Sequence, residues 1–175
     1  MNDSITVRRL GADEAAARVD ELVDVLIDCV EGGASVSFMR PLSAEKARAF
    51  WRRVAEGVAG DQRALLVAED GARRIVGTVQ LLLALPENQP HRADIAKLLV
   101  HRRARRQGVA QRLMDAVDST AREEGRTVLV LDTVTGGDAE RLYPRLGWQR
   151  VGDVPRYALM PDGRPCSTTF FYKHV

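Results

Sequence analysis

The 175-residue sequence predicts one α/β (α+β) domain, residues 1–175, with a mixed, mostly antiparallel sheet of about seven strands flanked by about four helices. Two observations lead to this prediction. Short segments with alternating or uninterrupted apolar residues are separated by segments in which apolar residues recur at helical spacing. In the second half of the chain, a strand, a helix and another strand follow one another at a length that favours a parallel pair.

A strand and two helices are expected at the beginning of the chain. Residues 5–9 alternate between polar and apolar side chains, as in a half-buried strand. The helix that follows ends at the glycine pair 32–33, because glycine readily adopts the left-handed conformation that terminates helices. Its apolar positions are Val19, Leu22, Val23, Leu26, Ile27 and Val30. Ser43 can cap a second helix, whose end is marked by Gly57 and Gly60.

Three strands are expected in the middle of the chain. Residues 64–69 and 74–83 are apolar segments on either side of Asp70 and Gly71, a dipeptide that favours a hairpin turn. A further strand is expected over residues 92–100.

The remaining elements alternate between helix and strand. A helix over residues 109–124 has apolar side chains on one side. The uninterrupted apolar run 128–131 predicts a strand that is buried on both faces. A short helix over residues 138–146 and two strands, 148–158 and 168–174, complete the expected order.

A basic turn that contains a glycine joins strand 92–100 to the helix after Gly108. At the start of a helix the first amides have no intrahelical acceptor, and the macrodipole adds partial positive charge. The turn therefore predicts a backbone site for a phosphate or pyrophosphate. The chain contains neither G-x-x-x-x-G-K-[ST] nor a G-x-G-x-x-G that opens a βαβ unit, which argues against a nucleotide triphosphatase and a dinucleotide-binding unit.

The arginines at positions 102–106 leave an alternative open, since they could form a solvated basic face or bind nucleic acid. The formal net charge of +2 and the aromatic content of 5% favour neither polyanion binding nor base stacking. We therefore expect no nucleic-acid partner.

Other protein classes are disfavoured by composition. Cys29 and Cys166 are far apart and form no C-x-x-C motif, which argues against a disulfide framework and a zinc site. The three histidines have no paired spacing, which argues against a catalytic metal. No apolar run approaches the roughly 18 residues of a membrane span, and the first residues lack the features of a signal peptide. We expect a cytoplasmic protein.

Arg105, Gly108 and Ala110 form an R-x-x-G-x-A pattern. This pattern resembles the Q/R-x-x-G-x-G/A signature of the GNAT superfamily of N-acetyltransferases. The expected order of elements, β-α-α-β-β-β-α-β-α-β-β, is similar to that of the GNAT fold over the whole chain, with the turn at the corresponding place.

The resemblance implies acetyl-CoA as the cofactor. It also implies that strand 92–100 carries a bulge at residues 98–100 and splays away from strand 128–131, so that pantetheine amides pair with the free strand edge while amides of the turn hold the pyrophosphate. The residues implied in cofactor binding are Leu98, Leu99, Val100, Arg105, Arg106, Gln107, Gly108, Val109 and Ala110. Arg102, Arg103 and Arg106 would only screen phosphate charge at the rim.

Three residues are implied in catalysis. Tyr143 lies in a segment similar to the family's Y-x-x-x-G-F/W, where the tyrosine acts as general acid; Pro144 follows it and is tolerated only in the first turn of a helix. Asp94 and Asp132 flank the expected cleft and are candidates for the base that removes the amine proton, directly or through a water. Alternatively, each carboxylate caps a strand end or pairs with an arginine, or Asp94 binds a cationic substrate. Strand alternation predicts that Asp94 shares its face with Ala96, Leu98 and Val100.

The implied activity is acetyl transfer to the primary amine of a small molecule. Segments 32–39, 131–133 and 161–164 are most similar to the tabtoxin-resistance acetyltransferase group, which implies an amino-acid-like acceptor and a role in detoxification. The alternatives are a protein lysine or N-terminal acetyltransferase and a noncatalytic module that binds acyl-CoA or nucleic acid.

Exposed apolar strand ends near the C-terminus would permit a homodimer. The acceptor-binding residues implied are Gly33, Phe38 and Met39, although their segment could equally be a plain linking loop.

Overall fold

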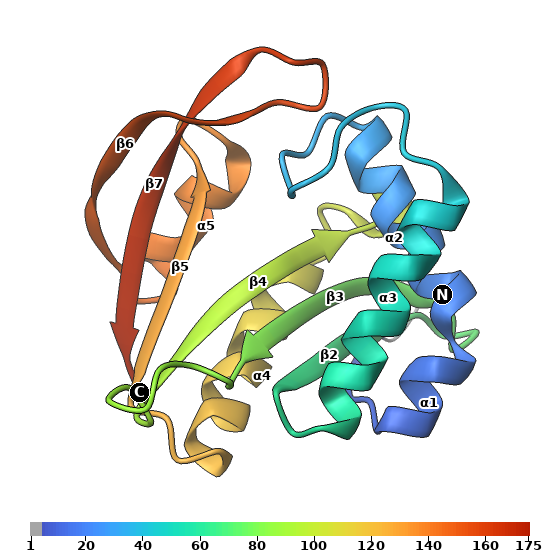
Figure 1. The fold of residues 1–175 in the computed structure, drawn as a ribbon, viewed down its shortest axis with the longest axis horizontal. Coiled ribbons are helices and arrows are strands. Elements are labelled where there is room, and N and C mark those ends of the chain that lie inside the picture. The colour runs from blue at the N-terminus through green and yellow to red at the C-terminus, as the bar shows by residue number, and fades with distance from the viewer. Residues whose placement is uncertain (1–4) are drawn as a thin grey trace.

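The computed structural model describes residues 5–175 and shows a seven-stranded sheet in the order β1-β2-β3-β4-β5-β7-β6, with helices on both faces (Figure 1). The strands are β1 (Thr6–Arg9), β2 (Arg63–Glu69), β3 (Ile75–Leu82), β4 (Arg92–Val100), β5 (Val128–Val134), β6 (Gln149–Leu159) and β7 (Pro165–His174). The helices are α1 (Ala12–Ala17), α2 (Val19–Glu31), α3 (Ala44–Ala59), α4 (Val109–Glu123) and α5 (Asp138–Arg145), with a short 3-10 helix, η1 (Arg102–Ala104). The predicted mixed sheet is confirmed.

Two apolar cores lie on opposite faces of the sheet. One face is covered by α1, α2 and α3, whose largest buried side chain is Trp51, and the other by α4 and α5 (Figure 1). Burial on both faces explains the apolar run Ala64–Ala68 of β2 and the buried residues of β3, among which Thr78 and Gln80 are polar. Within the described residues 5–175, no helix has the length and apolar composition to cross a membrane.

The predicted parallel pair is confirmed, and the two strands separate as expected. Residues 92–94 of β4 are paired with residues 128–130 of β5, and beyond Asp94 the two strands share no register. Beyond this point β5 stays paired with β7 instead, through Val134. The sheet is thus continuous at one end of β4 and divided at the other.

The bulge of β4 lies earlier than predicted. Thr78 of β3 faces Leu99 and Gln80 faces Ala96, so Lys97 and Leu98 together oppose a single residue of β3. Because of the extra residue, the side chains that follow the bulge point to the opposite faces of the sheet from those that a regular strand would give them.

The prediction that Leu98 and Val100 share the face of Asp94 is therefore wrong. Leu98 and Val100 pack against the core of α4, whereas Leu99 is buried in the core of α1, α2 and α3. Asp94 consequently shares its face with Leu99, because one inserted residue exchanges the two sides of a strand.

Three further details differ from the prediction. The first helical segment is two helices, because the chain breaks at Arg18, whose guanidinium binds Glu21 and Glu69. The link between β2 and β3 runs from Asp70 to Arg74 instead of turning at a dipeptide, and the Asp70 carboxylate accepts from the Arg74 amide at 2.9 Å. Gly57 lies inside α3 instead of ending it. A Cβ at this position would meet the Arg63 side chain at 2.5 Å, so the close approach of Arg63 accounts for the glycine.

An ion-pair network ties β1 and β2 to the first helices. The Glu69 side chain is 4% exposed and accepts hydrogen bonds from Arg8 at 2.9 Å and from Arg18. The hydrogen bonds from these guanidinium groups lower the pKa of Glu69 to about 2. Glu69 therefore stabilises the folded state above its unfolded pKa of about 4.3, and this contribution is lost as the pH falls toward 2.

Glu69→Gln should destabilise the protein at neutral pH by about 1.5–3 kcal/mol, because two partly buried arginines lose their shared carboxylate. Thermal unfolding followed by circular dichroism should show Tm lowered by about 3–12 °C, with a smaller difference from wild type near pH 2 than at pH 7. Glu87→Gln, in the exposed loop between β3 and β4, is the matched control and should behave as wild type. A constant difference at all pH values would contradict the role of Glu69.

Candidate active site

The turn before α4 has the backbone geometry of an anion site. Gly108 is the N-cap residue of α4, with φ of 72° and no side-chain cap, and the first turn of the helix contains no acidic residue. The first amides of α4 therefore have neither an intrahelical acceptor nor a capping carboxylate. A Cβ at Gly108 would meet nothing within 4 Å, so the space beside this backbone is open. Arg106 is also left-handed, with φ of 60°.

The arginines of the turn have different roles. Arg102 binds Asp28 of α2, and Arg103 binds Asp24 of α2 at 3.0 Å, so these two charges are paired within the protein. That they screen phosphate charge stays a prediction. Arg105 Nε donates to the Val100 carbonyl at 3.2 Å, which fixes the end of β4.

Within residues 5–175, Arg106 is the arginine of this turn whose side chain makes neither an ion pair nor a hydrogen bond, and it is exposed. Of the side chains in the turn, Arg106 is thus the one whose charge is available to a bound anion.

The register of β4 identifies the backbone group that faces the gap. The His101 amide donates to the Val76 carbonyl at 2.9 Å, and Leu99 lies opposite Thr78 in the same register. In an antiparallel ladder the N–H groups of alternate residues point to opposite sides. The Leu99 amide therefore faces β3, and the Val100 amide points to the side from which β5 has separated.

Tyr143 is a buried residue of α5 and belongs to the core on the α4 side of the sheet. Its side chain packs against Trp148 and Phe171, with ring centroids 5.8 and 5.5 Å away. Burial, assisted by the Asp132 carboxylate, raises the pKa of Tyr143 well above its usual range. The hydroxyl therefore stays protonated at neutral pH, and it has no hydrogen-bond partner in the part of the chain that the structure describes.

Pro144 lies in the last turn of α5, not in the first turn where a proline costs nothing. The helix ends one position later, at Arg145, so the disturbance is confined to its end. The Tyr143 carbonyl accepts from the amides of Leu146 at 3.0 Å and Trp148 at 3.1 Å. These bonds fix the backbone of Tyr143 despite the proline.

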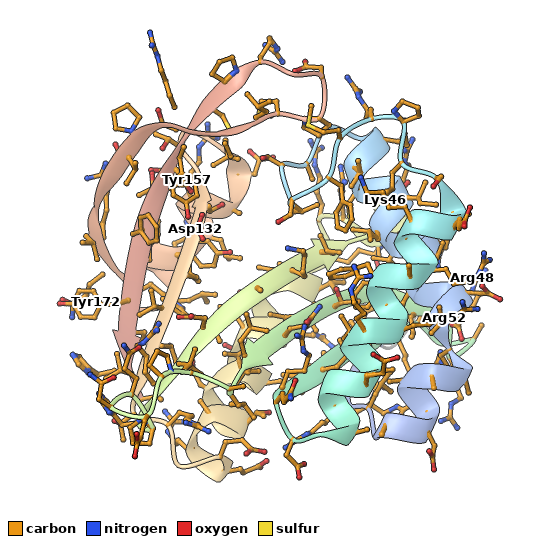
Figure 2. The ribbon with its side chains drawn as sticks, viewed as in Figure 1. Lys46, Arg48, Arg52, Asp132, Tyr157 and Tyr172 are labelled. Carbon is orange, nitrogen blue, oxygen red and sulfur yellow. The ribbon has the colours of Figure 1, made fainter. Side chains whose placement is uncertain are left out.

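A cavity of about 330 Å³ lies between β5, the β6–β7 hairpin and the α2–α3 loop, which comprises residues 32–43. Asp132 of β5 and Tyr157 of β6 both line it, and Figure 2 shows these two side chains in the divided part of the sheet. Of the predicted acceptor residues, Phe38 and Met39 line the cavity and Gly33 does not. The remaining lining residues are Ser35, Ser37, Thr133, Val134, Ala158, Leu159, Cys166, Ser167 and Thr168.

The two candidate carboxylates have different surroundings. Asp94 lies where β4 is still paired with β5, and it forms an ion pair with Arg92. Asp132 lies beyond the last paired residue, and its Oδ2 accepts from Thr168 Oγ1 at 2.7 Å. The structure therefore brings Asp132 into the cavity and leaves Asp94 at the closed end of the cleft.

Two hydrogen bonds join the α2–α3 loop to the β6–β7 hairpin. Ser35 Oγ donates to the Leu159 carbonyl at 3.1 Å, and the Arg40 amide donates to the Pro161 carbonyl at 3.0 Å. The hairpin arches over the cleft toward this loop (Figure 1). The contact closes the cavity on the side away from the sheet.

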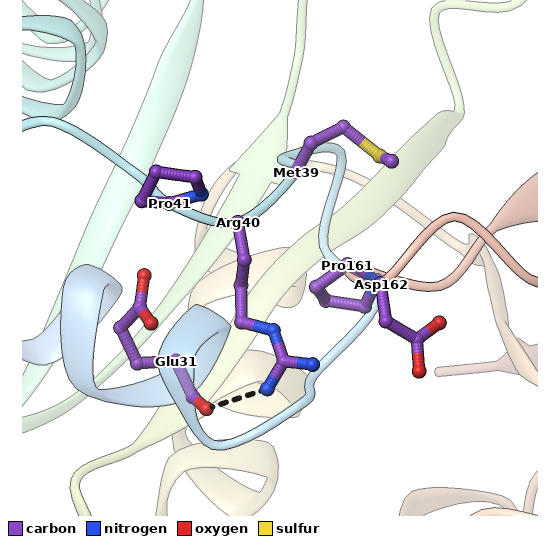
Figure 3. Close-up of a pocket in the computed structure, with 6 residues that line it drawn as sticks. All are labelled: Glu31, Met39, Arg40, Pro41, Pro161 and Asp162. Atoms are coloured by element: carbon purple, nitrogen blue, oxygen red, sulfur yellow. Dashed lines mark hydrogen bonds between the residues drawn. The ribbon is translucent and has the colours of Figure 1, made fainter.

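A shallow surface pocket of about 480 Å³ lies outside this contact (Figure 3). Arg40 spans it and donates to the Glu31 carbonyl at 3.2 Å, which anchors the loop to the end of α2 (Figure 3). Asp132 and Tyr143 do not line this pocket, so we assign it to loop anchoring.

Comparisons with known proteins agree with this geometry. Residues 26–148 match the family model described as the acetyltransferase (GNAT) family. The chain belongs to the GNAT acetyltransferase family. Members of this family use acetyl-CoA as the acetyl donor, and the chain is an N-acetyltransferase by family membership.

Solved structures share the fold over nearly the full length of the chain. A ribosomal-protein-alanine N-acetyltransferase from Brucella melitensis is 23% identical, with 97% of this chain and 99% of that chain covered and a TM-score of 0.78. A GCN5-related N-acetyltransferase from Kribbella flavida is 22% identical, with 98% of each chain covered and a TM-score of 0.79. A proposed acetyltransferase from Salmonella typhimurium, solved with its cofactor acetyl-CoA, is 18% identical, with 98% and 94% covered and a TM-score of 0.78.

The residues of this chain fit acetyl-CoA. The uncapped amides of α4, the open space beside Gly108 and the unpaired Arg106 suit a diphosphate. The unpaired edge of β4 suits the amides of the pantetheine arm.

Gly108→Val should weaken acetyl-CoA binding by about tenfold or more, because a β-branched residue at a positive φ is strained and its methyl groups would cover the open backbone. Isothermal titration calorimetry with acetyl-CoA measures the change in Kd.

The matched control is Gly125→Val at the opposite end of α4, where φ is 67° and a Cβ also meets nothing within 4 Å. This variant carries similar strain and should bind acetyl-CoA as wild type does. Wild-type affinity in a folded Gly108→Val variant would rule out the turn as the diphosphate site.

Proposed function

We propose that the protein transfers the acetyl group of acetyl-CoA to a primary amine of a small molecule. The observation that carries this proposal is the cavity beside Asp132, which two segments bridge on the side away from the sheet. The α2–α3 loop and the β6–β7 hairpin are hydrogen-bonded to each other over it, through Ser35 with Leu159 and Arg40 with Pro161. A groove for a peptide would need these two segments to stand apart, whereas about 330 Å³ suits a small acceptor.

Asp132 is the residue we assign to the amine. An amine with a pKa near 10.4 is almost fully protonated at pH 7, so it must lose a proton before it can react. The Asp132 carboxylate lines the cavity and can bind the ammonium group and accept its proton at Oδ1, while Oδ2 is held by Thr168. Asp94 is paired with Arg92 and is assigned to the closed end of the cleft.

We assign Tyr143 and Val100 to the acetyl donor. When bound, acetyl-CoA supplies an acetyl group activated as a thioester. The Tyr143 hydroxyl keeps its proton because burial raises its pKa, and as a general acid it could donate this proton to the thiolate that leaves when the C–S bond breaks. The Val100 amide faces the gap between β4 and β5. It could donate a hydrogen bond to the carbonyl oxygen of the acetyl group, which gains negative charge when the amine attacks.

The finer assignment to the tabtoxin-resistance group, and hence to detoxification, belongs to the same proposal. It rests on segments 32–39, 131–133 and 161–164. Residues of the first two line the cavity, and Pro161 of the third accepts the hydrogen bond from Arg40 of the α2–α3 loop. The rival is acetylation of protein lysines or N-termini, because the similar protein from Brucella melitensis is a ribosomal-protein-alanine N-acetyltransferase.

We also propose that residues 1–175 act as one domain in the cytoplasm, where acetyl-CoA is available. The continuous seven-stranded sheet from β1 to β7 supports the single domain. A homodimer stays a prediction, supported by four exposed apolar side chains on the edge strand β6, namely Val151, Val154, Tyr157 and Leu159.

A free-thiol release assay tests the proposal directly. Purified protein and acetyl-CoA are incubated with amino acids, polyamines, aminoglycosides and lysine-containing or N-terminally free peptides. Thiol release above background is expected with a small amine and not with peptides. Preferential release with peptides would contradict the small-molecule acceptor, and the absence of release with every amine would favour a noncatalytic acyl-CoA-binding module.

Tyr143→Phe should lower kcat about 100-fold and leave the Kd for acetyl-CoA unchanged, because phenylalanine keeps the packing against Trp148 and Phe171 and removes only the proton donor. Thiol-release kinetics and calorimetry measure the two quantities. Tyr172→Phe is the matched control, since the Tyr172 hydroxyl donates to Gln149 Oε1 at 2.5 Å. Equal turnover by wild type and Tyr143→Phe would remove Tyr143 from the mechanism.

Asp132→Asn should lower kcat/KM about 100-fold, whereas Asp94→Asn should cost much less, because only Asp132 lines the cavity. Asparagine preserves the size of each side chain and the hydrogen bond to Thr168. Steady-state kinetics with the best acceptor from the panel compares the two variants. A larger loss in Asp94→Asn would reverse their assigned roles.

A further inference from the structure

A lysine at the edge of the acceptor cavity lacks a counter-ion. Lys97 is the residue with positive φ, 54°, in the bulge of β4, and its Nζ donates to Ser37 Oγ at 3.1 Å. Ser37, which also has a positive φ of 77°, lines the cavity. Lys97 does not itself line the cavity, but its ammonium group is hydrogen-bonded to a residue that does. No carboxylate forms an ion pair with it among residues 5–175.

The surroundings of Lys97 leave its charge poorly compensated. Its Nζ lies 5.8 Å from the centroid of the Phe50 ring, a contact worth only about 0.5–2 kcal/mol. Burial lowers the pKa of Lys97; the Asp132 carboxylate opposes this shift and Arg63 adds to it. Arg63 is bound to the neutral side chain of Gln80 at 2.9 Å. Asp132 is thus the carboxylate that acts on Lys97, and Arg63 is a second cation beside it. The Asp94 carboxylate, further along β4, is already paired with Arg92.

The arrangement of these charges constrains the acceptor. If Asp132 binds the amine, as the proposed function has it, Lys97 is left with one hydroxyl and one aromatic ring. A half-buried ammonium group is stabilised far better by an anion than by these neutral groups. An acceptor with a second amine would instead add a cation beside Lys97, at a cost in binding.

We infer that the acceptor carries a carboxylate or an equivalent anionic group beside its amine, and that Lys97 binds this group through Nζ while Asp132 binds the amine. This inference rests on the proposed function, since it describes the second contact of the same acceptor. Polyamines and aminoglycosides, which carry no anion, are disfavoured by this site.

The test compares the best acceptor of the thiol-release panel with its carboxamide, which keeps the amine and removes only the negative charge. The wild-type enzyme should prefer the acid by about 10- to 100-fold in kcat/KM, as expected for a hydrogen bond between charged groups. In Lys97→Met this ratio should fall to about 1, and in Lys97→Arg the preference for the acid should remain. Lys46→Met, at an exposed position of α3, is the matched control and should keep the wild-type ratio (Figure 2).

Three outcomes would overturn the inference. They are a best acceptor without an anionic group, a wild-type enzyme that does not distinguish the acid from its carboxamide, and an unchanged ratio in Lys97→Met. The first two need no variant, so they decide the matter even if Lys97→Met is unstable. Thiol release with neutral or dicationic amines alone rejects the inference and leaves the acetyltransferase intact, whereas no release with any amine rejects the proposed function and this inference together.

Discussion

The separation of β4 from β5 is the constraint on which the site depends. The two strands are paired only at residues 92–94 and 128–130, so β4 continues toward Val100 with one edge unpaired. Buried or partly buried backbone groups need partners, and a strand-like ligand can supply them. The gap stays open because each side is held from elsewhere: β5 by its pairing with β7, and β4 by its pairing with β3 and by α4 packed closely on that strand. A Cβ at Gly77 would meet side chains of α4 at 3.1 Å.

The bulge of β4 separates a part of the strand that packs in the core from a part that contributes groups to the site. Before the bulge, Ala93 and Ile95 face α4 and belong to the core. The extra residue turns Lys97 toward the acceptor cavity and exchanges the faces of the residues that follow, so that the Val100 amide reaches the gap. A regular strand would place neither group there. One inserted residue thus brings a charged side chain and a backbone donor into the same cleft.

The sequence predicts most of the fold and less of the site. The order of elements, the parallel pair and the turn at Gly108 follow from local patterns, namely periodicity, helix ends and one short motif. The position of the bulge does not, because it depends on the register between β3 and β4, and nothing in residues 92–100 alone fixes that register. Lys97 was missed for this reason. The sequence predicts Asp94 and Asp132 equally as the base. The structure distinguishes them, because the β4–β5 pairing includes Asp94 and ends before Asp132.

The arginine-rich turn shows why charge alone does not locate the anion site. Arg102 and Arg103 are paired with Asp28 and Asp24, so the site is left to backbone amides and Arg106. These ion pairs have a second consequence. They fix the cofactor turn to α2, and the α2–α3 loop, which closes the acceptor cavity, begins where α2 ends. A shift of α2 would therefore move the cofactor turn and the cavity wall together, so the two ligands share one positioning element although they occupy different sides of the cleft.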